Sequence, residues 1–301
     1  MRFGMIGLGR MGGNLSLQAI GKGHQVVGYS PNQSEAEPLV PKGLEPASSI
    51  EDLARRLSHP RIVFIYVPHG RPTDQVCEAL QGALSGGDIV IDGGNSHWRE
   101  SIRRHERFKG LGINFLDCGT SGGIDGAREG ACFMVGGEER SFRIAEPIFR
   151  DLAVPEGVFY AGSSGAGHFA KLIHNAIEFG MLQAIGEGVA LLEASEYRFD
   201  LPGLMRNWAH GSVIRSWLIE LMERGLRENK LNDLSAYVED TREVRWAVEF
   251  ALEKEVWIPV ISQAELALYR SRDRENVSAK AVALLRHGFG GHPLHRKVQS
   301  S

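Results

Sequence analysis

The feature that most constrains this chain is a glycine-rich turn close to its N-terminus. The turn follows a short apolar segment, residues 2–6, and precedes a segment whose apolar residues recur with helical spacing. Glycine at its first, third and sixth positions permits a tight turn and lets backbone N–H groups approach an anion at the start of the helix. The turn consists of Gly7, Leu8, Gly9, Arg10, Met11 and Gly12. A turn with a purely structural role could have the same glycine pattern. A strand before the turn and a helix after it favour a pyrophosphate site instead, and hence a bound dinucleotide.

The end of the second strand should contact the adenosine ribose of that dinucleotide. A carboxylate there binds the 2′-hydroxyl of NAD, whereas an arginine suits the 2′-phosphate of NADP. The strand predicted at 25–29 is followed by Ser30 and Asn32, which can hydrogen-bond to either group. We therefore expect NAD or NADP as the cofactor, with the preference undecided. Ser30, Asn32 and Val67, which ends a later strand, are the expected contacts beyond the glycine turn.

The first half of the chain alternates short apolar runs with segments long enough for crossover helices. This alternation is typical of an α/β fold with a doubly wound parallel sheet, which is Rossmann-like. The strands are predicted at 2–6, 25–29, 62–67, 88–91, 114–118, 132–136 and 158–160. We assign residues 1–164 to this dinucleotide-binding domain.

The second half of the chain, from about residue 165, has helical spacing and almost no strand signal. The helices are predicted at 168–195, 201–209, 213–228, 242–254, 260–272 and 277–286. The sequence G-S-S-G-A-G at 162–167 is a plausible hinge before the first of them. The sequence therefore predicts an all-α C-terminal domain at 165–301.

Composition excludes several classes of function. The formal net charge of −3 gives no basic field for nucleic acid, and no apolar run approaches the ~20 residues of a membrane helix. An opening strand leaves no room for a signal peptide. The three cysteines form no C-x-x-C pair and are typical of reduced thiols in a cytoplasmic protein. We expect neither a membrane nor a nucleic-acid partner, and no metal.

Two further loops follow predicted strands of the sheet. D-G-G-N-S at 92–96 ends in the polar pair Asn95 and Ser96, and Ser121, Gly122 and Gly123 follow the next strand. Open α/β sheets bind ligands at the carboxyl ends of their strands, where both loops would lie beside the glycine turn. Each alone could be an ordinary loop, but their common edge favours a site.

The long predicted helix carries a polar stripe. Lys171, His174, Asn175 and Glu178 occupy positions i, i+3, i+4 and i+7, and therefore share one face. A solvated face with a helical ion pair is the simplest interpretation of such a stripe. The surrounding residues are mostly apolar, however, which favours an acid–base pair in a dry site.

These motifs, in this order, resemble the β-hydroxyacid dehydrogenase superfamily and, within it, 6-phosphogluconate dehydrogenase. The residues that carry the resemblance are D-G-G-N-S, S-G-G and K-x-x-H-N-x-x-E, followed by R-H-G-F-G-G-H at 286–292. The length is similar to the short forms, which have one helical unit where longer relatives have two. The resemblance implies oxidative decarboxylation of a phosphorylated sugar acid in the pentose phosphate pathway, by a homodimer whose helical domain binds substrate and the partner subunit.

The resemblance also implies a role for each matching residue. Lys171 would be the general base and Glu178 the acid that protonates C1 of the product enediol. Arg286 and His292 would bind the 6-phosphate from a partner subunit, although alone they would be interpreted as a basic surface tail. The other implied substrate contacts are Asn95, which also touches the cofactor, and Ser121, Gly122, Gly123, His174 and Asn175.

Several positions depart from the family pattern. Phe179 stands where the family has a tyrosine that helps to bind the phosphate, and Thr241 and Leu268 align with a phosphate-binding lysine and arginine. Nearby arginines that could compensate are Arg245, Arg270 and Arg272. W-A-H-G-S-V-I-R-S at 208–216 resembles a family segment in which Arg215 has a structural or subunit-packing role.

Two other functions fit the same residues. One is a non-decarboxylating dehydrogenase of a small acid such as 3-hydroxyisobutyrate, with the same lysine base. Asn95, Glu178 and the 286–292 tail favour the sugar phosphate over this substrate. The other is a dinucleotide-sensing module without turnover, which the intact Lys171 and Glu178 disfavour.

Overall fold

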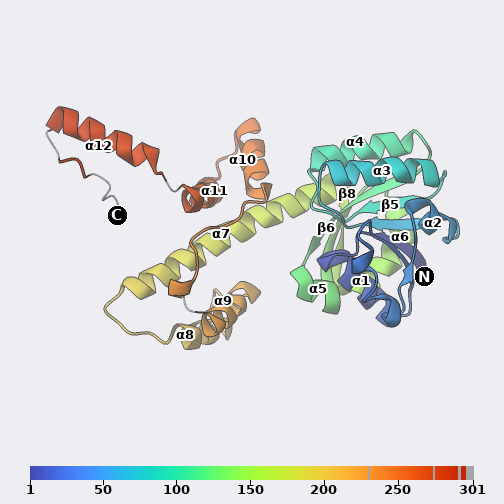
Figure 1. Cartoon of the computed structure of the whole chain (residues 1–301), viewed down its shortest axis with the longest axis horizontal. Coiled ribbons are helices and arrows are strands. Elements are labelled where there is room, and N and C mark those ends of the chain that lie inside the picture. Colours follow the sequence, from blue (N-terminus) through green and yellow to red (C-terminus); the bar gives the residue numbers. More distant parts are fainter. Residues whose placement is uncertain (230, 274, 291–292, 296–301) are drawn as a thin grey trace. The chain divides into compact units, whose positions relative to one another are not determined.

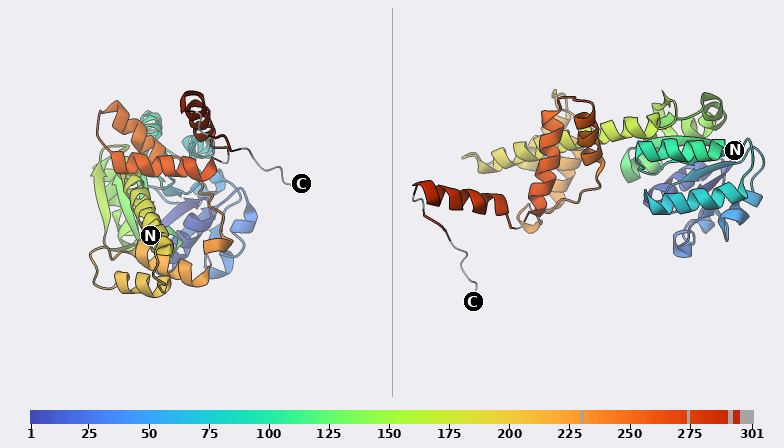
Figure 2. Two further views of the ribbon diagram at one scale, coloured as in Figure 1. Left: turned by 90° about the vertical axis from the view of Figure 1, so that its left-hand side faces the viewer. Right: turned by 90° about the horizontal axis from the view of Figure 1, so that it is seen from above.

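A computed structural model describes residues 1–229, 231–273, 275–290 and 293–295. The chain divides into two compact units, Met1–His174 and Asn175–Ser301, and each is described by itself. The division falls inside helix α7 (Ala166–Ala194), whose ribbon is continuous (Figure 2). The predicted domain boundary at 164/165 lies just before this helix begins and stays a prediction.

The described residues of the first unit form an eight-stranded sheet with helices on both faces (Figure 1). The strand order is β3-β2-β1-β4-β5-β6-β7-β8. Because the chain winds outward from β1 in both directions, the switch point lies between β1 and β4, where such sheets bind ligands. The strands are β1 (Arg2–Ile6), β2 (Gln25–Tyr29), β3 (Glu45–Pro46), β4 (Ile62–Ile65), β5 (Ile89–Asp92), β6 (Asn114–Ser121), β7 (Ala131–Gly136) and β8 (Ala153–Gly162).

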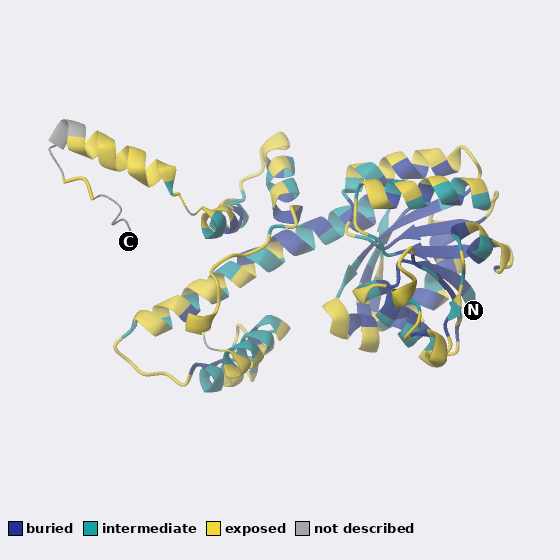
Figure 3. Cartoon of the chain, in the orientation of Figure 1, coloured by how far each residue is buried: buried dark blue, intermediate teal, exposed yellow. Residues whose placement is uncertain are grey.

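The helices of this unit form two layers, each with its own apolar core. Helices α1, α5 and α6 cover one face of the sheet and α2, α3 and α4 cover the other. Side chains alternate along each strand, so that Met5 enters the first core and Ile6 the second. The central strands β1, β4 and β5 are buried along most of their length (Figure 3), as expected of parallel strands covered on both faces, whereas the edge strand β8 is mostly intermediate or exposed. These helices and turns are α1 (Arg10–Gly21), η1 (Gln33–Glu35), η2 (Val40–Lys42), α2 (Ile50–Arg55), α3 (Arg71–Ala83), α4 (Trp98–Lys109), α5 (Gly123–Glu129) and α6 (Glu139–Leu152).

The doubly wound fold predicted from the sequence is confirmed, with two differences. The short edge strand β3 was not predicted, because Glu45–Pro46 has no apolar run. Strand β7 runs antiparallel to β6, whereas every other neighbouring pair is parallel. Residues 122–130 join β6 to β7, fewer than the dozen or so that a parallel crossover needs, so the chain turns back instead.

The described part of the second unit is helical, as predicted. A small core formed by Val189, Leu201, Met205 and Ile219 joins α7, α8 and α9. Helix α9 begins four residues later than predicted, because the Ser216 hydroxyl caps it by accepting from Ile219 N at 3.3 Å. No helix among the described residues is long and apolar enough to span a membrane. The elements that follow α7 are α8 (Leu201–Ala209), α9 (Trp217–Glu228), η3 (Leu231–Asp233), α10 (Glu243–Glu253), α11 (Pro259–Arg272) and α12 (Val277–Gly290).

Candidate functional site

The glycine turn joins β1 to α1, and its three motif glycines are required for different reasons. Gly7 has φ of +89°, and a Cβ there would collide with the backbone of Tyr66. A Cβ on Gly12 would collide with the Gly7 carbonyl, so this glycine lets the helix pack against the turn. By contrast, the nearest atom to a Cβ on Gly9 would be Glu35 Oε1, 3.8 Å away. Packing within the described chain therefore explains Gly7 and Gly12, whereas the open space at Gly9 leaves its expected role, close approach of a ligand, as a prediction.

The N-terminus of α1 is suited to an anion. Gly9 occupies the N-cap position, and no side chain of the described residues caps the helix there. Its first turn contains no acidic residue. Gly9 and Arg10 are exposed, whereas Leu8 is buried beneath the turn. The first backbone N–H groups of α1 can therefore bind a pyrophosphate, which the helix dipole also favours.

The segment after β2 holds a carboxylate that the sequence reasoning missed. Ser30 is buried, and its hydroxyl donates to Glu35 Oε2 at 2.6 Å. The Asn32 side-chain oxygen accepts from the Ser34 hydroxyl at 2.8 Å and caps the turn η1. Glu35 does not directly follow the strand, where a ribose-binding acid is expected. Its position 23 residues after Gly12 was the available signal, since the ribose-binding acid of this fold lies about 20 residues on.

Val67 lies between the glycine turn and the D-G-G-N-S loop. A Cβ on Gly7 would lie 3.0 Å from Val67 Cγ1, and a Cβ on Gly94 would lie 2.9 Å from the Val67 carbonyl oxygen. Gly93 lies against the ring of Tyr66, where a Cβ would not fit. The two loops therefore meet at the end of β4, beside the switch point of the sheet.

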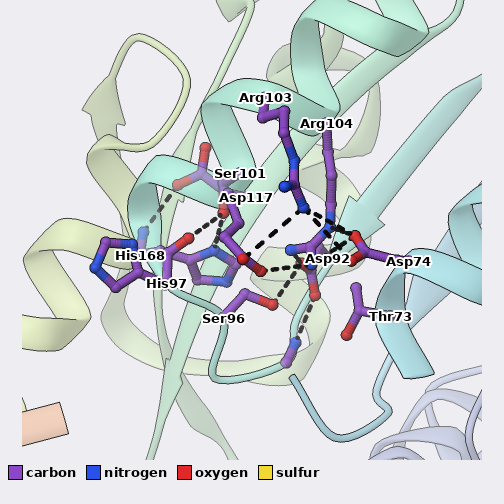
Figure 4. Close-up of polar contacts among 12 residues, drawn as sticks. Thr73, Asp74, Asp92, Ser96, His97, Ser101, Arg103, Arg104, Asp117 and His168 are labelled. Atoms are coloured by element: carbon purple, nitrogen blue, oxygen red, sulfur yellow. Dashed lines mark hydrogen bonds and ion pairs between the residues drawn. The ribbon is translucent and has the colours of Figure 1, made fainter. Parts of the chain in front are cut away.

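A buried ion network supports the D-G-G-N-S loop from below (Figure 4). Asp92 is fully buried; its Oδ2 accepts from the Ser96 hydroxyl at 2.8 Å and its Oδ1 from Gly94 N at 3.1 Å. Arg104, itself 1% exposed, lies 3.5 Å from Asp92 Oδ2 and donates to Asp74 Oδ1 at 3.0 Å. The network fixes the loop backbone and leaves Asn95 exposed at its tip.

Two titratable groups beside these loops stay neutral. Desolvation, reinforced by Cys118 nearby, raises the pKa of Tyr66, whose hydroxyl lies 2.9 Å from Thr120 Oγ1. Desolvation also raises the pKa of the Cys118 thiol. Tyr66 and Cys118 therefore support the loops and do not supply an anionic nucleophile.

The S-G-G turn ends β6 and meets the long helix. Gly122 and Gly123 have φ of +117° and +60°, a backbone conformation that favours glycine. Ser121 Oγ lies 3.0 Å from Nε2 of His174. The structure therefore brings the predicted S-G-G turn and one member of the predicted stripe into contact.

Lys171 lies against β6 beside that contact. A Cβ on Gly119 would collide with the Lys171 side chain, so this glycine admits the lysine. Lys171 Nζ lies 3.4 Å from His174 Nδ1. A protonated lysine can only donate, so Nδ1 would accept, and Nε2 would carry the proton that is shared with Ser121.

The start of α7 is fixed by a buried carboxylate. Asp117 Oδ1 accepts from Gly165 N at 2.6 Å and Oδ2 from His168 N at 2.8 Å. His168 is buried too, with Nδ1 2.7 Å from the Ser101 hydroxyl (Figure 4). Strand β6 thus holds the helix that carries Lys171, through a residue that the sequence reasoning did not single out.

The remaining predicted site residues lie in the second unit. Asn175 is buried on α7, and Glu178 and Phe179 are partly exposed one turn later. Arg286 is exposed on α12, and His292 lies outside the described residues. Leu268 is 6% exposed, which excludes it from a polar pocket. Of the described positions proposed for the phosphate, Phe179 lies on α7, Leu268 on α11 and Arg286 on α12.

Two of the arginines that could compensate in the phosphate pocket form ion pairs within the second unit. Arg245 pairs with Glu249 at 2.8 Å and Arg272 with Asp240 at 3.1 Å. Thr241 and Arg270 are exposed. No group of three or more His, Cys, Asp or Glu suited to a metal occurs in the described part of the chain.

A doubly wound sheet with a glycine turn at its switch point, and a lysine-bearing helix against the same sheet, is typical of NAD(P)-binding dehydrogenases. The sequence profile described as the NAD binding domain of 6-phosphogluconate dehydrogenase matches residues 2–162. The chain belongs to the 6-phosphogluconate dehydrogenase family. It is therefore an oxidoreductase by family, with an NAD(P)-binding N-terminal domain and a helical second part.

Relatives match the chain along nearly its whole length. The YqeC protein of Bacillus subtilis (strain 168), which carries 6-phosphogluconate dehydrogenase as a provisional name, is 47% identical over 99% of this chain and 100% of its own. An NAD(+)-dependent, decarboxylating 6-phosphogluconate dehydrogenase of Haloferax volcanii is 39% identical over 99% of each chain.

Solved structures share the fold. That of Plasmodium falciparum 6-phosphogluconate dehydrogenase, studied apo and with NADP+ or 6-phosphogluconate, has a TM-score of 0.83 at 26% identity. It is matched over 67% of its length by all of this chain. Mycobacterium tuberculosis 3-hydroxyisobutyrate dehydrogenase with L-serine has a TM-score of 0.71 at 22% identity, over 90% of this chain and 94% of its own.

Proposed function

We propose that this enzyme oxidises and decarboxylates 6-phosphogluconate, giving ribulose 5-phosphate, CO2 and reduced NAD(P). The observation that carries the proposal is the contact chain from Lys171 through His174 to Ser121, on the sheet that holds the dinucleotide turn. The relatives named as 6-phosphogluconate dehydrogenases support the same substrate. Such a reaction belongs to the pentose phosphate pathway.

The bound nicotinamide supplies the hydride acceptor. Lys171 removes the proton of the substrate 3-hydroxyl while the hydride leaves C3, which becomes a ketone. Protonated Lys171 then donates a hydrogen bond to that ketone oxygen. When CO2 leaves, the electron pair of the broken C–C bond moves into this polarised ketone, which needs no metal. Glu178, seven positions along α7, protonates C1 of the enediol and completes ribulose 5-phosphate.

Binding of the rest of the substrate falls to the loops and the helical part. Asn95, the S-G-G turn, His174 and Asn175 would hold its carboxylate and hydroxyls. Arg286 and His292 would bind the 6-phosphate from the partner chain of a homodimer. This end of the site would have fewer hydrogen-bond donors than the family pattern. Phe179 has no hydroxyl, and Thr241 and buried Leu268 stand where the family has a lysine and an arginine.

Those losses favour one alternative, a dehydrogenase of a small unphosphorylated 3-hydroxy acid. It would use the same Lys171 base but would release no CO2. The substrates therefore separate by one measurement on the purified protein: kcat/KM for 6-phosphogluconate and for 3-hydroxyisobutyrate, with CO2 release followed in parallel. We expect 6-phosphogluconate to be preferred, with one CO2 per reduced cofactor.

The contrary outcomes are distinct. Oxidation of 3-hydroxyisobutyrate at least as efficient as that of 6-phosphogluconate would replace the proposal by the alternative. Binding of dinucleotide without turnover of any sugar acid would instead indicate a sensing module.

A further inference from the structure

A carboxylate lies beside the glycine at which the dinucleotide is expected to approach the turn most closely. Glu35 stands at the end of η1, where its Oε2 accepts the Ser30 hydroxyl at 2.6 Å. Its other oxygen, Oε1, would lie 3.8 Å from a Cβ on Gly9, nearer than any other described atom. One oxygen of Glu35 is thus held by Ser30, while the other faces the surface of the glycine turn.

The local structure holds this carboxylate in place. Ser30 is 6% exposed, and it directs its single hydroxyl proton to Glu35. Asn32 caps η1, with its side-chain oxygen accepting from both Ser34 N at 3.3 Å and Ser34 Oγ at 2.8 Å. Glu35 is therefore oriented before any ligand binds, which limits the entropy lost on binding.

The chemistry of the two cofactors differs at this point of the fold. In NAD, the adenosine ribose carries a 2′-hydroxyl, which can donate to a carboxylate. In NADP, a 2′-phosphate stands there, which carries negative charge and offers mainly acceptors. The segment 30–42 contains two carboxylates, Glu35 and Glu37, and a single base, Lys42. Arg10 is exposed at the start of α1, outside this segment.

We propose that Glu35, positioned by Ser30, makes this protein select NAD over NADP by accepting a hydrogen bond from the adenosine ribose. The carboxylate repels a 2′-phosphate, so one side chain both favours the first cofactor and disfavours the second. The inference rests on the NAD-binding domain and not on the proposed substrate or reaction.

Binding of NADH and NADPH to the full-length protein, measured by calorimetry without substrate, tests the proposal. We expect the wild type to bind NADH at least about tenfold more tightly than NADPH, and Glu35→Gln to reduce that ratio about tenfold. Glu37→Gln is the matched control, because Glu37 is exposed two residues further along and should leave the ratio unchanged. Circular dichroism of each variant checks that the fold is retained.

A double-mutant cycle tests the role of Ser30. Ser30→Ala alone should lower the ratio of NADH affinity to NADPH affinity. The same substitution should have little further effect on this ratio when added to Glu35→Gln, because Ser30 acts through Glu35. A structural role for Ser30 would give equal effects in both backgrounds and would overturn its positioning role. Equal or tighter binding of NADPH by the wild type, or an unchanged ratio in Glu35→Gln, would overturn the proposal for Glu35 while leaving the proposed reaction untouched.

Discussion

Replacing Asp117 by alanine should weaken the attachment of α7 to the sheet. Its fully buried carboxylate accepts the N–H groups of Gly165 and His168 at 2.6 and 2.8 Å. Each hydrogen bond to a charged group contributes ~1.5–3 kcal/mol, so the two set a range of ~3–6 kcal/mol. Water entering the vacated space would satisfy part of the lost bonding, so we expect a loss of about 3–4 kcal/mol.

Urea unfolding followed by circular dichroism measures this loss as a change in midpoint at constant slope. Asp117→Asn keeps one acceptor oxygen and should cost about half as much as Asp117→Ala. Asp233→Ala, in the exposed turn η3, is the control. It removes a carboxylate without leaving a buried donor unpaired, so its free energy of unfolding should stay within about 0.5 kcal/mol of the wild-type value.

The same substitution should alter catalysis, because Lys171 lies in the second turn of α7. A displaced helix start should lower kcat more than it lowers NADH affinity, since the glycine turn belongs to other elements. A stability loss below about 1 kcal/mol in Asp117→Ala would refute the claim that these two bonds fix the start of the helix.

Four further changes have defined outcomes. Lys171→Ala should lower kcat by about 10²–10⁴-fold with NADH affinity nearly unchanged, and near-normal turnover would remove the lysine from the chemistry. Gly9→Ala has room within the chain, so calorimetry should show NADH affinity falling about tenfold at an unchanged Tm; unchanged affinity would contradict a close approach of the ligand. Arg286→Ala should raise KM for 6-phosphogluconate and leave kcat nearly intact, whereas a constant KM would place Arg286 outside the site. Desolvation raises the pKa of Glu265, with Tyr269 partly opposing, so its stabilising contribution is present below the unfolded-state pKa and is lost as pH rises through the folded-state pKa. The Tm of Glu265→Gln should therefore exceed that of the wild type by more at neutral pH than at acidic pH. A difference in Tm that is the same across about pH 4–8 would refute the predicted direction of the pH dependence.

Much of the fold could be predicted because parallel strands buried on both faces are continuous apolar runs. β4 has no polar residue and β1 has none after Arg2, and each is followed by a turn or loop that starts the next crossover. The position of the glycine turn followed directly, since a strand, three spaced glycines and a helix occur together in few other contexts. The polar stripe on α7 was predicted from helical spacing alone.

Contacts between residues distant in sequence were beyond this reasoning. Asp117 caps a helix that begins 49 residues later, at Ala166, and no local pattern links the two. Arg104 reaches Asp92 and Asp74 from another helix, so its burial could not be inferred from its own helix. Glu35 lies outside the strand whose end was expected to contact the ribose, and its hydrogen bond from Ser30 and its proximity to Gly9 appear only in the fold.

The orientation of the stripe illustrates why such contacts decide the site. Helical spacing shows that Lys171 and His174 share a face, but not which way that face points. Residues two apart on a strand share a face as well, and on β6 these are Gly119 and Ser121. Gly119 admits the lysine and Ser121 meets His174, so one face of one strand orients two positions of the stripe. Because Gly119 lies against Lys171, a larger side chain at this position would displace the proposed base without altering any group that takes part in the chemistry.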